Sequence, residues 1–121
     1  MSHVNPIPQG VVIGNMVFSS VIAGQDPETG RYVGDPEGQV KAAFVNLRRF
    51  LAAAGASLDD VAKVDVFVNE QPIRELVNRE CLATFPDPGN RPARHVHTIH
   101  PGSPQDVVVQ LEIVALLPDP T

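Results

Sequence analysis

The sequence predicts a single α+β domain in which two helices cover one face of a sheet, in the order β-β-α-β-α-β-β. Three observations support this fold class: an apolar hairpin near the N-terminus, two segments with helical periodicity, and later segments with strand patterns. The chain has 121 residues, enough for one domain, and contains no internal repeat or long linker. We therefore expect residues 1–121 to form one folded unit.

The first half of the chain contains a hairpin followed by a helix. Residues 11–13 and 16–22 read as two strands around the two-residue turn Gly14-Asn15. Asp35-Pro36-Glu37 then supplies an N-cap, a proline at the first helical position and an acid in the first turn, and Gly55 ends the segment. Between these signals, apolar residues recur every three or four positions, which predicts an amphipathic helix.

The second half predicts a strand, a helix and two further strands. Residues 61–68 alternate as a strand requires, and residues 72–85 form a helix of weaker periodicity. The last strands are expected at 93–99 and 106–117. The final strand is apolar on both faces, with Val107, Val109, Leu111 and Ile113 on one side and Val108, Val114 and Leu116 on the other. Two helices cover only one face, so we expect another subunit to cover the second.

Composition narrows the class of protein. Nine basic and fourteen acidic residues give a net charge of −5 without a basic stripe, so we expect no nucleic-acid partner. Cys81 is the only cysteine, which excludes an internal disulfide and a thiolate zinc site and fits a reducing compartment. The N-terminus lacks the pattern of a signal peptide, and no window is long enough to span a membrane. These features predict a soluble cytoplasmic protein without a membrane partner.

Arg94 is the first candidate for a functional side chain. It follows Arg91-Pro92-Ala93 at the start of an alternating segment, in a chain whose net charge is −5. A planar guanidinium with fixed donors is well suited to hold a carboxylate with two hydrogen bonds. We expect Gln110, on the last strand, to face it. The alternative is a strand-end arginine paired to a surface acid.

For the three histidines and the cysteine we expect no metal-binding or catalytic role. Alternation puts His95 and His97 on one strand face, opposite to Arg94, with His100 nearby in sequence. Two imidazoles at that spacing could bind a metal, but no acid or thiolate motif accompanies them, so we predict no metal site. Cys81 lies in the second helix without a basic neighbour other than the arginine two positions before it, and an inert thiol is expected.

Several motifs, in order, resemble the reactive intermediate deaminases, also called the YjgF or L-PSP endoribonuclease-like family. The resemblance runs from about Pro6 to Leu117. The motifs that carry it are Gly14-Asn15-Met16-Val17-Phe18-Ser19-Ser20, Asp26-Pro27-Glu28-Thr29-Gly30, residues 52–61, Pro92-Ala93-Arg94 and Gln110-Leu111-Glu112-Ile113-Val114-Ala115. The resemblance implies a chorismate-mutase-like fold and a homotrimer with three sites in the clefts between subunits.

The resemblance also implies an activity. In the family, the arginine of Pro-Ala-Arg binds the carboxylate of a 2-imino or 2-enamino acid, and water hydrolyses the imine to a 2-oxo acid and ammonia. Arg94 matches that arginine, and Asn78 matches an asparagine of the second helix. No metal or organic cofactor is implied.

The chain departs from the family where the pocket is expected. Ile7 stands where the family usually has a tyrosine, and Val96 where a cysteine is frequent. Ser20-Val21-Ile22 replaces the usual Ser-Gly-Gln, so the glycine that lets a ligand approach the backbone is absent. These changes make the expected pocket more apolar.

The departure with the greatest chemical consequence is Gln110. It stands where the resemblance places the acid that activates water, and Glu112 matches a second acid on the same strand face. An amide can orient water but cannot take its proton near neutral pH.

The sequence thus favours a homotrimeric deaminase of small imino or enamino carboxylates. Arg94 and Gln110 are the expected catalytic residues, and the substrate pocket is expected to include Arg94, Asn78, Val96, Val21, Ile7 and Ser20. A dedicated catabolic step, such as deamination of an aminomuconate-like compound, fits the more apolar pocket. The alternative is a non-catalytic or regulatory trimer that binds small carboxylates and has lost water activation. Ribonuclease activity is suggested only by the family's older name.

Overall fold

The computed structural model describes residues 9–99 and 106–118. Within these residues the chain forms six β-strands, two α-helices and two short 3-10 helices. In chain order they are β1 (Gly10–Ile13), β2 (Met16–Ser19), β3 (Ile22–Ala23), α1 (Pro36–Ala54), η1 (Leu58–Asp60), β4 (Val61–Val68), α2 (Gln71–Thr84), η2 (Pro88–Asn90), β5 (Ala93–Thr98) and β6 (Val109–Leu116).

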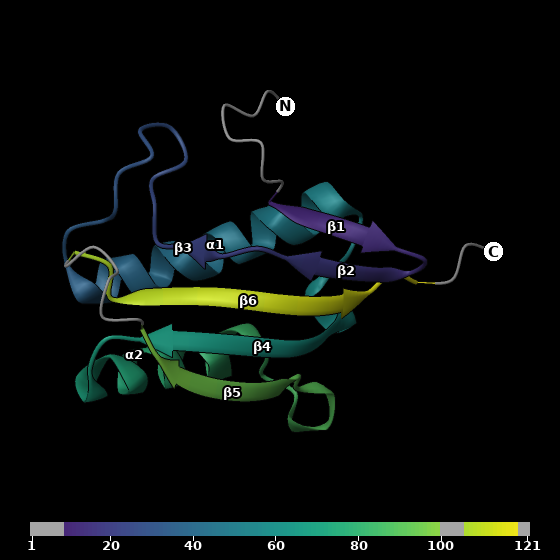
Figure 1. Ribbon diagram of the computed structural model, residues 1–121. Helices are drawn as coiled ribbons and strands as arrows, with labels where there is room; N and C mark the ends of the chain where they lie inside the picture. The colour runs from purple at the N-terminus through teal and green to yellow at the C-terminus, as the bar shows by residue number, and fades with distance from the viewer. Residues whose placement is uncertain (1–8, 100–105, 119–121) are drawn as a thin grey trace.

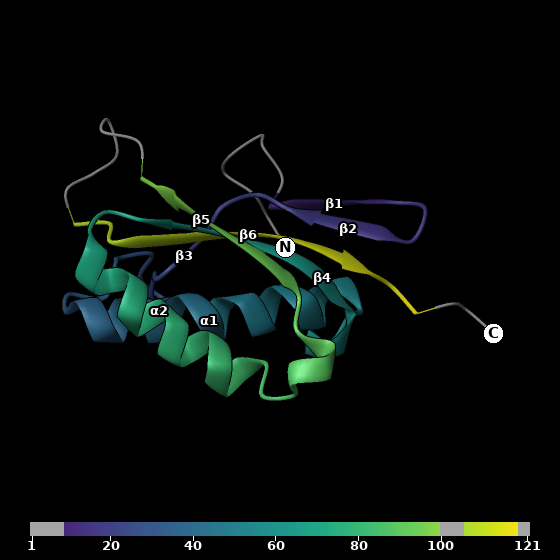
Figure 2. The same ribbon diagram turned by 90° about the horizontal axis from the view of Figure 1, so that it is seen from below.

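The strands form one sheet in the order β1-β2-β6-β4-β5, and β3 also pairs with β6 (Figure 1). β4 and β5 run parallel, while the other pairs are antiparallel. Both helices of the described chain lie on the same side of this sheet (Figure 2). The predicted α+β fold with one helix-covered face is therefore confirmed. We call the other side the open face.

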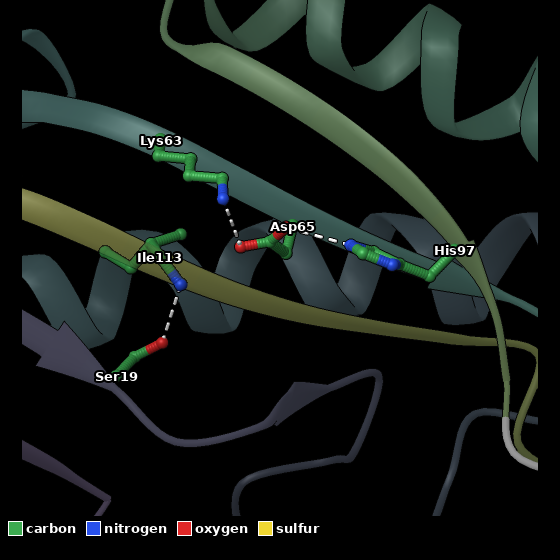
Figure 3. A network of polar contacts seen from close by, with 5 residues as sticks. All are labelled: Ser19, Lys63, Asp65, His97 and Ile113. Atoms are coloured by element: carbon green, nitrogen blue, oxygen red, sulfur yellow. Dashed lines mark hydrogen bonds and ion pairs between the residues drawn. The ribbon is translucent and has the colours of Figure 1, made fainter.

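The predicted hairpin is confirmed, but its second strand is shorter than expected. Gly14 has a φ of 63°, which suits the tight turn between β1 and β2. The strand expected at 16–22 stops at Ser19 and resumes at Ile22 as β3. The Ser19 hydroxyl accepts the Ile113 N–H at 2.8 Å, so a side chain takes the place of a backbone carbonyl at this point of β6 (Figure 3).

Helix α1 begins and ends where its capping residues predict. The Asp35 carboxylate accepts the Gly38 N–H at 2.8 Å, which satisfies a free donor of the first turn. Gly55 ends the helix in the left-handed conformation, with φ at 81°. Helix α2 spans Gln71–Thr84 rather than 72–85, a one-residue difference at each end. Among the helices described, none has the length and apolar character needed to cross a membrane.

The core lies between the helices and the inward side of the sheet. In β4 and β6, alternate residues point toward the helices and are fully buried, as Val64 and Leu111 illustrate with 0% exposure. Burying these side chains is the main favourable term for the fold. The intervening residues of both strands point to the open face.

The last strand differs from its prediction in two respects. It spans Val109–Leu116 instead of 106–117, because the Val108 N–H bonds to the Gln39 side chain and not to a neighbouring strand. Its open face is also less apolar than expected. Gln110 and Glu112 share that face with Val114, since they alternate with the buried residues of β6.

The Gln39 side chain joins α1 to the segment that enters β6. It is 1% exposed, yet both ends of its amide are paired. Nε2 donates to the carbonyls of Val33 (3.1 Å) and Asp106 (2.8 Å), and Oε1 accepts the Val108 N–H at 2.7 Å. A buried amide with three such bonds satisfies backbone groups that have no strand partner here.

We expect Gln39→Leu to lower the free energy of unfolding by about 1–3 kcal/mol, because leucine fills the space but leaves buried backbone groups unpaired. Gln39→Ala adds a cavity and should cost about 2–4 kcal/mol. Urea unfolding at fixed protein concentration measures both. Gln71→Leu, at an exposed glutamine of α2, is the control and should change stability by less than about 0.5 kcal/mol. Equal effects at positions 39 and 71 would contradict this role for Gln39.

Candidate functional site

The Arg94 side chain projects from the face of the sheet that the helices cover. Its strand, β5, is an edge strand that pairs with β4 in the described part of the chain. Arg94 stands opposite Val64, and neighbouring residues in register point to the same face. Because Val64 is buried beneath the helices, the Arg94 side chain also points toward the layer that contains α2.

A cavity of about 360 Å³ lies beside Arg94, and we call it the Arg94 cavity. Helix α2 supplies Asn78, Cys81 and Leu82 to its wall, at the three- and four-residue spacing of one helix face. The full lining consists of Val64, Asn78, Cys81, Leu82, Phe85, Arg91, Pro92 and Arg94. The wall is therefore mainly apolar, with an amide, a thiol and two guanidinium groups as its polar side chains.

The two arginines of this wall have different roles. Arg91 is used by the fold, since Nε donates to the Phe85 carbonyl at 2.9 Å and Nη2 to the Pro86 carbonyl at 3.3 Å. Within residues 9–99 and 106–118, no carboxylate lies within 4.0 Å of the Arg94 guanidinium. The pairing with a surface acid that we considered for Arg94 is thus not found in this part of the chain. Its donors can take an anionic ligand.

Cys81 is closer to a cation than the sequence suggested. Burial raises the pKa of its thiol, while the Arg94 side chain on the same cavity wall acts in the opposite direction. The expectation that the thiol lacks a basic neighbour other than Arg79 is therefore wrong. The parallel pairing of β5 with β4 brings Arg94 to α2, and no local sequence signal shows this contact.

Gln110 does not face Arg94 within one chain, so this expectation is wrong for the monomer. Gln110 is in register with Phe67 of β4 and alternates with Leu111, which is buried under the helices. Its side chain therefore belongs to the open face, as does that of Glu112. Arg94 belongs to the helix face, so the sheet itself separates the two candidate catalytic residues.

The other expected pocket residues are also dispersed. Asn78 lines the Arg94 cavity, whereas Val96 lines a smaller hollow at the other end of β5, of about 120 Å³. Val21 lines a hollow of about 550 Å³ on the opposite side of the molecule, beside β3, and Ser20 is exposed next to it. Ile7 lies outside the described residues.

The histidines on β5 have an acid beside them, contrary to the expectation from sequence. Asp65 of β4 is in register with His95, and its Oδ1 lies 2.9 Å from Nε2 of His97 (Figure 3). Lys63 Nζ lies 3.6 Å from the other carboxylate oxygen. The bond with His97 lowers the pKa of Asp65, and the nearby Lys63 acts in the same direction. His100 lies outside the described residues.

Alternation in 61–68 could have indicated that Asp65 faces away from the core. The register between β4 and β5 could not be read from the sequence, and it is this register that brings the acid to the histidines.

We expect the Cys81 thiol to ionise at higher pH than a free cysteine, because burial disfavours the thiolate. Arg94→Ala removes the cation that opposes this shift and should move the midpoint of thiol alkylation to still higher pH. Iodoacetamide labelling across pH, followed by mass spectrometry, reports one site because the chain has one cysteine. Arg79→Ala, on the same helix, is the control. A midpoint that Arg94→Ala lowers or leaves unchanged would contradict the contact.

Comparison with known proteins places the chain in a family. Residues 2–117 match the family model described as Endoribonuclease L-PSP. A RutC family protein of Pyrococcus abyssi is 34% identical over 116 residues, covering 93% of this chain and 87% of the relative. A 2-iminobutanoate/2-iminopropanoate deaminase of Salmonella typhimurium is 31% identical over 114 residues, covering 93% and 88% of the two chains.

Solved structures show the same fold. RidA from an Antarctic Psychrobacter superposes with a TM-score of 0.82 at 29% identity, covering 96% of this chain and 92% of that one. TdcF of Escherichia coli, solved with bound serine, gives a TM-score of 0.83 at 27% identity and covers 96% and 91%. The expected YjgF-like fold is thereby confirmed, and this chain belongs to the L-PSP endoribonuclease-like family, which includes the Rid and YjgF proteins.

Proposed function

We propose that this chain hydrolyses the carbon–nitrogen bond of small 2-imino or 2-enamino carboxylic acids, releasing a 2-oxo acid and ammonia. The observation that carries the proposal is the Arg94 guanidinium, which has no acidic partner among the described residues and stands on the wall of a mainly apolar cavity. Membership of the family and relatives named 2-iminobutanoate/2-iminopropanoate deaminase support this chemistry.

In this proposal Arg94 binds the substrate carboxylate through two parallel hydrogen bonds. The Asn78 amide offers a donor and an acceptor on the same wall, and the apolar side chains of Leu82 and Phe85 take the substrate's carbon chain. A cavity of about 360 Å³ suits a small molecule. Holding the carboxylate in place positions the adjacent C=N carbon for attack.

The reaction consumes only water. An enamine substrate first moves a proton from nitrogen to carbon and becomes the imine. Water then adds to the C=N carbon, the nitrogen takes up a proton, and the resulting amino alcohol loses ammonia as its C–O bond becomes the carbonyl of the 2-oxo acid. The protein's part is to orient the imine and the attacking water.

We further propose that the complete site forms between subunits of a homotrimer. Arg94 is on the edge strand β5, while Ser20 and Val21 lie beside β3, on the far side of β6. These two groups cannot meet within one chain, but a second copy can bring them together. Exposed apolar side chains on the hairpin, including Val12 at 52% and Ile13 at 66%, support burial against another subunit.

The partner subunit would also supply Gln110, which is in register with Phe67 on β4 and adjoins Ala23 of β3. There its amide would orient the attacking water. The apolar residues at positions 7 and 21 favour a substrate with more hydrocarbon than the smallest imino acids, such as an aminomuconate-type enamine.

One observation favours a second candidate, a trimer that binds small carboxylates without catalysis. Within the described residues, the wall of the Arg94 cavity contains no acid that could take a proton from water. Binding by Arg94 does not need such a group, whereas efficient hydrolysis benefits from one. We do not propose ribonuclease activity, because the net charge of −5 opposes RNA binding.

Arg94→Ala should lower kcat/KM for imine hydrolysis by about 10- to 100-fold, the loss of one strong charge-assisted interaction. Arg94→Lys keeps the charge but not the paired donors, so its kcat/KM should lie between those of the wild type and Arg94→Ala. Imines are generated in situ by an amino-acid oxidase, and formation of the 2-oxo acid is compared with and without protein. Arg79→Ala, an exposed arginine that pairs with Glu37, is the matched control.

The same assay separates the two candidates. No acceleration with any imine, together with Arg94-dependent binding of 2-oxo acids measured by calorimetry, would replace the deaminase by the binding protein. If the protein neither accelerates imine hydrolysis nor binds 2-oxo acids, the proposed role of Arg94 is overturned.

Mixed oligomers test the site between subunits. Arg94→Ala and Gln110→Ala should each keep no more than about a tenth of wild-type activity alone, whereas co-refolding them in equal amounts should raise activity to about one quarter of wild type, because one interface in four then combines two intact halves. No restoration would overturn the site between subunits, and an active Gln110→Ala would remove Gln110 from the mechanism. Gln110→Glu shows in addition whether a carboxylate improves on the amide.

A further inference from the structure

The open face carries a cluster of metal-ligating side chains that the proposed deaminase site does not use. Its members are Asp65 of β4 and His95 and His97 of β5, and we call them the DHH cluster. One ligating atom from each side chain lies within 4.8 Å of the other two. Alternation directs all three away from the helices, so the sheet separates them from Arg94.

We infer that the DHH cluster binds a divalent transition-metal ion, and that zinc fits its donors best. Two imidazole nitrogens and one carboxylate oxygen form a donor set that zinc uses in proteins, with a further position left to water or another ligand. Donor atoms around tetrahedral zinc lie about 3.3 Å apart, since the bonds are about 2.0 Å long. Side chains already within 4.8 Å reach that spacing by small torsional changes.

The surrounding residues hold two of the ligands in place. The ring of His97 stacks on that of Phe67, with centroids 4.6 Å apart and planes 16° from parallel. Its Nε2 lies 2.9 Å from Oδ1 of Asp65, so the two ligating groups already lie side by side (Figure 3). The His95 ring centroid lies 3.9 Å from that of His97. Ligands that are already ordered lose little entropy on binding a metal.

Charged side chains near the cluster have opposite effects on the binding of a cation. Glu112 of β6 is in register with Asp65 on the same face, so a second carboxylate lies one strand away and favours a cation. Lys63 Nζ is 3.6 Å from Oδ2 of Asp65, and its positive charge opposes the binding of a cation. A metal site therefore makes a prediction that a simple hydrogen-bond network does not: removing Lys63 should strengthen metal binding.

Metal binding is measured on protein without a histidine tag, freed of metal by a chelator. Zinc affinity comes from competition with a chromogenic chelator, and Co²⁺ replaces zinc to give an absorption spectrum that reports its coordination. Wild type should bind one ion per chain. His95→Gln removes a ligand but leaves the His97–Asp65 bond, so affinity should fall by about 100-fold without loss of thermal stability of the metal-free protein.

Two further variants make the assignment specific. Lys63→Met should raise zinc affinity by about 3- to 10-fold through the loss of a nearby positive charge. Cys81→Ser should leave it unchanged, because Cys81 lies on the helix side of the sheet. Lys41→Met, at an exposed lysine of α1, makes the same change in net charge away from the cluster and should leave zinc affinity unchanged.

The inference is overturned if the wild-type protein binds zinc no more tightly than His95→Gln, or if Cys81→Ser removes the binding. It is also overturned if Co²⁺ shows only the spectrum of the hydrated ion. These results are independent of imine hydrolysis, since neither the cluster nor the binding assay involves Arg94.

Discussion

The pairing of β6 with β2, β3 and β4 is the interaction on which the remaining structure depends. This strand lies near the end of the chain, so the hairpin and the β4–β5 pair belong to one sheet only after β6 has inserted between them. Its inward side chains, such as Leu111, complete the core under both helices. The approach to the strand is held by Gln39, whose buried amide bonds to the Asp106 carbonyl and the Val108 N–H.

The sheet that β6 completes separates the candidate functional side chains into two groups, one on each face. The helix side contains the Arg94 cavity, where a guanidinium without an acidic partner in the described chain stands among apolar side chains. The open side contains the polar residues that alternate with the core, including Gln110 and the DHH cluster. Carboxylate binding and metal binding are thus proposed for opposite faces, and only assembly with other copies can bring Gln110 to Arg94.

Most of the fold could be predicted because its signals are local. Asp35 and Gly55 mark the ends of α1 through capping groups that bond within a few residues, and Gly14 marks the hairpin through its positive φ. The sequence did not predict the break between β2 and β3, where the Ser19 hydroxyl accepts a hydrogen bond from the N–H of Ile113, a residue distant in sequence. The start of β6 was missed for the same reason, since Gln39 takes the Val108 N–H.

For the candidate site, the sequence by itself determined the fold class, the family resemblance and the identity of Arg94 and Asn78 as residues of interest. It also determined that His95 and His97 share a strand face, because alternation is a local property of the backbone. Only the tertiary structure decided that Cys81 lies beside Arg94, that Gln110 lies on the opposite face, and that Asp65 joins the histidines. Strand order and register decide such contacts, and these are set by packing between segments far apart in the chain.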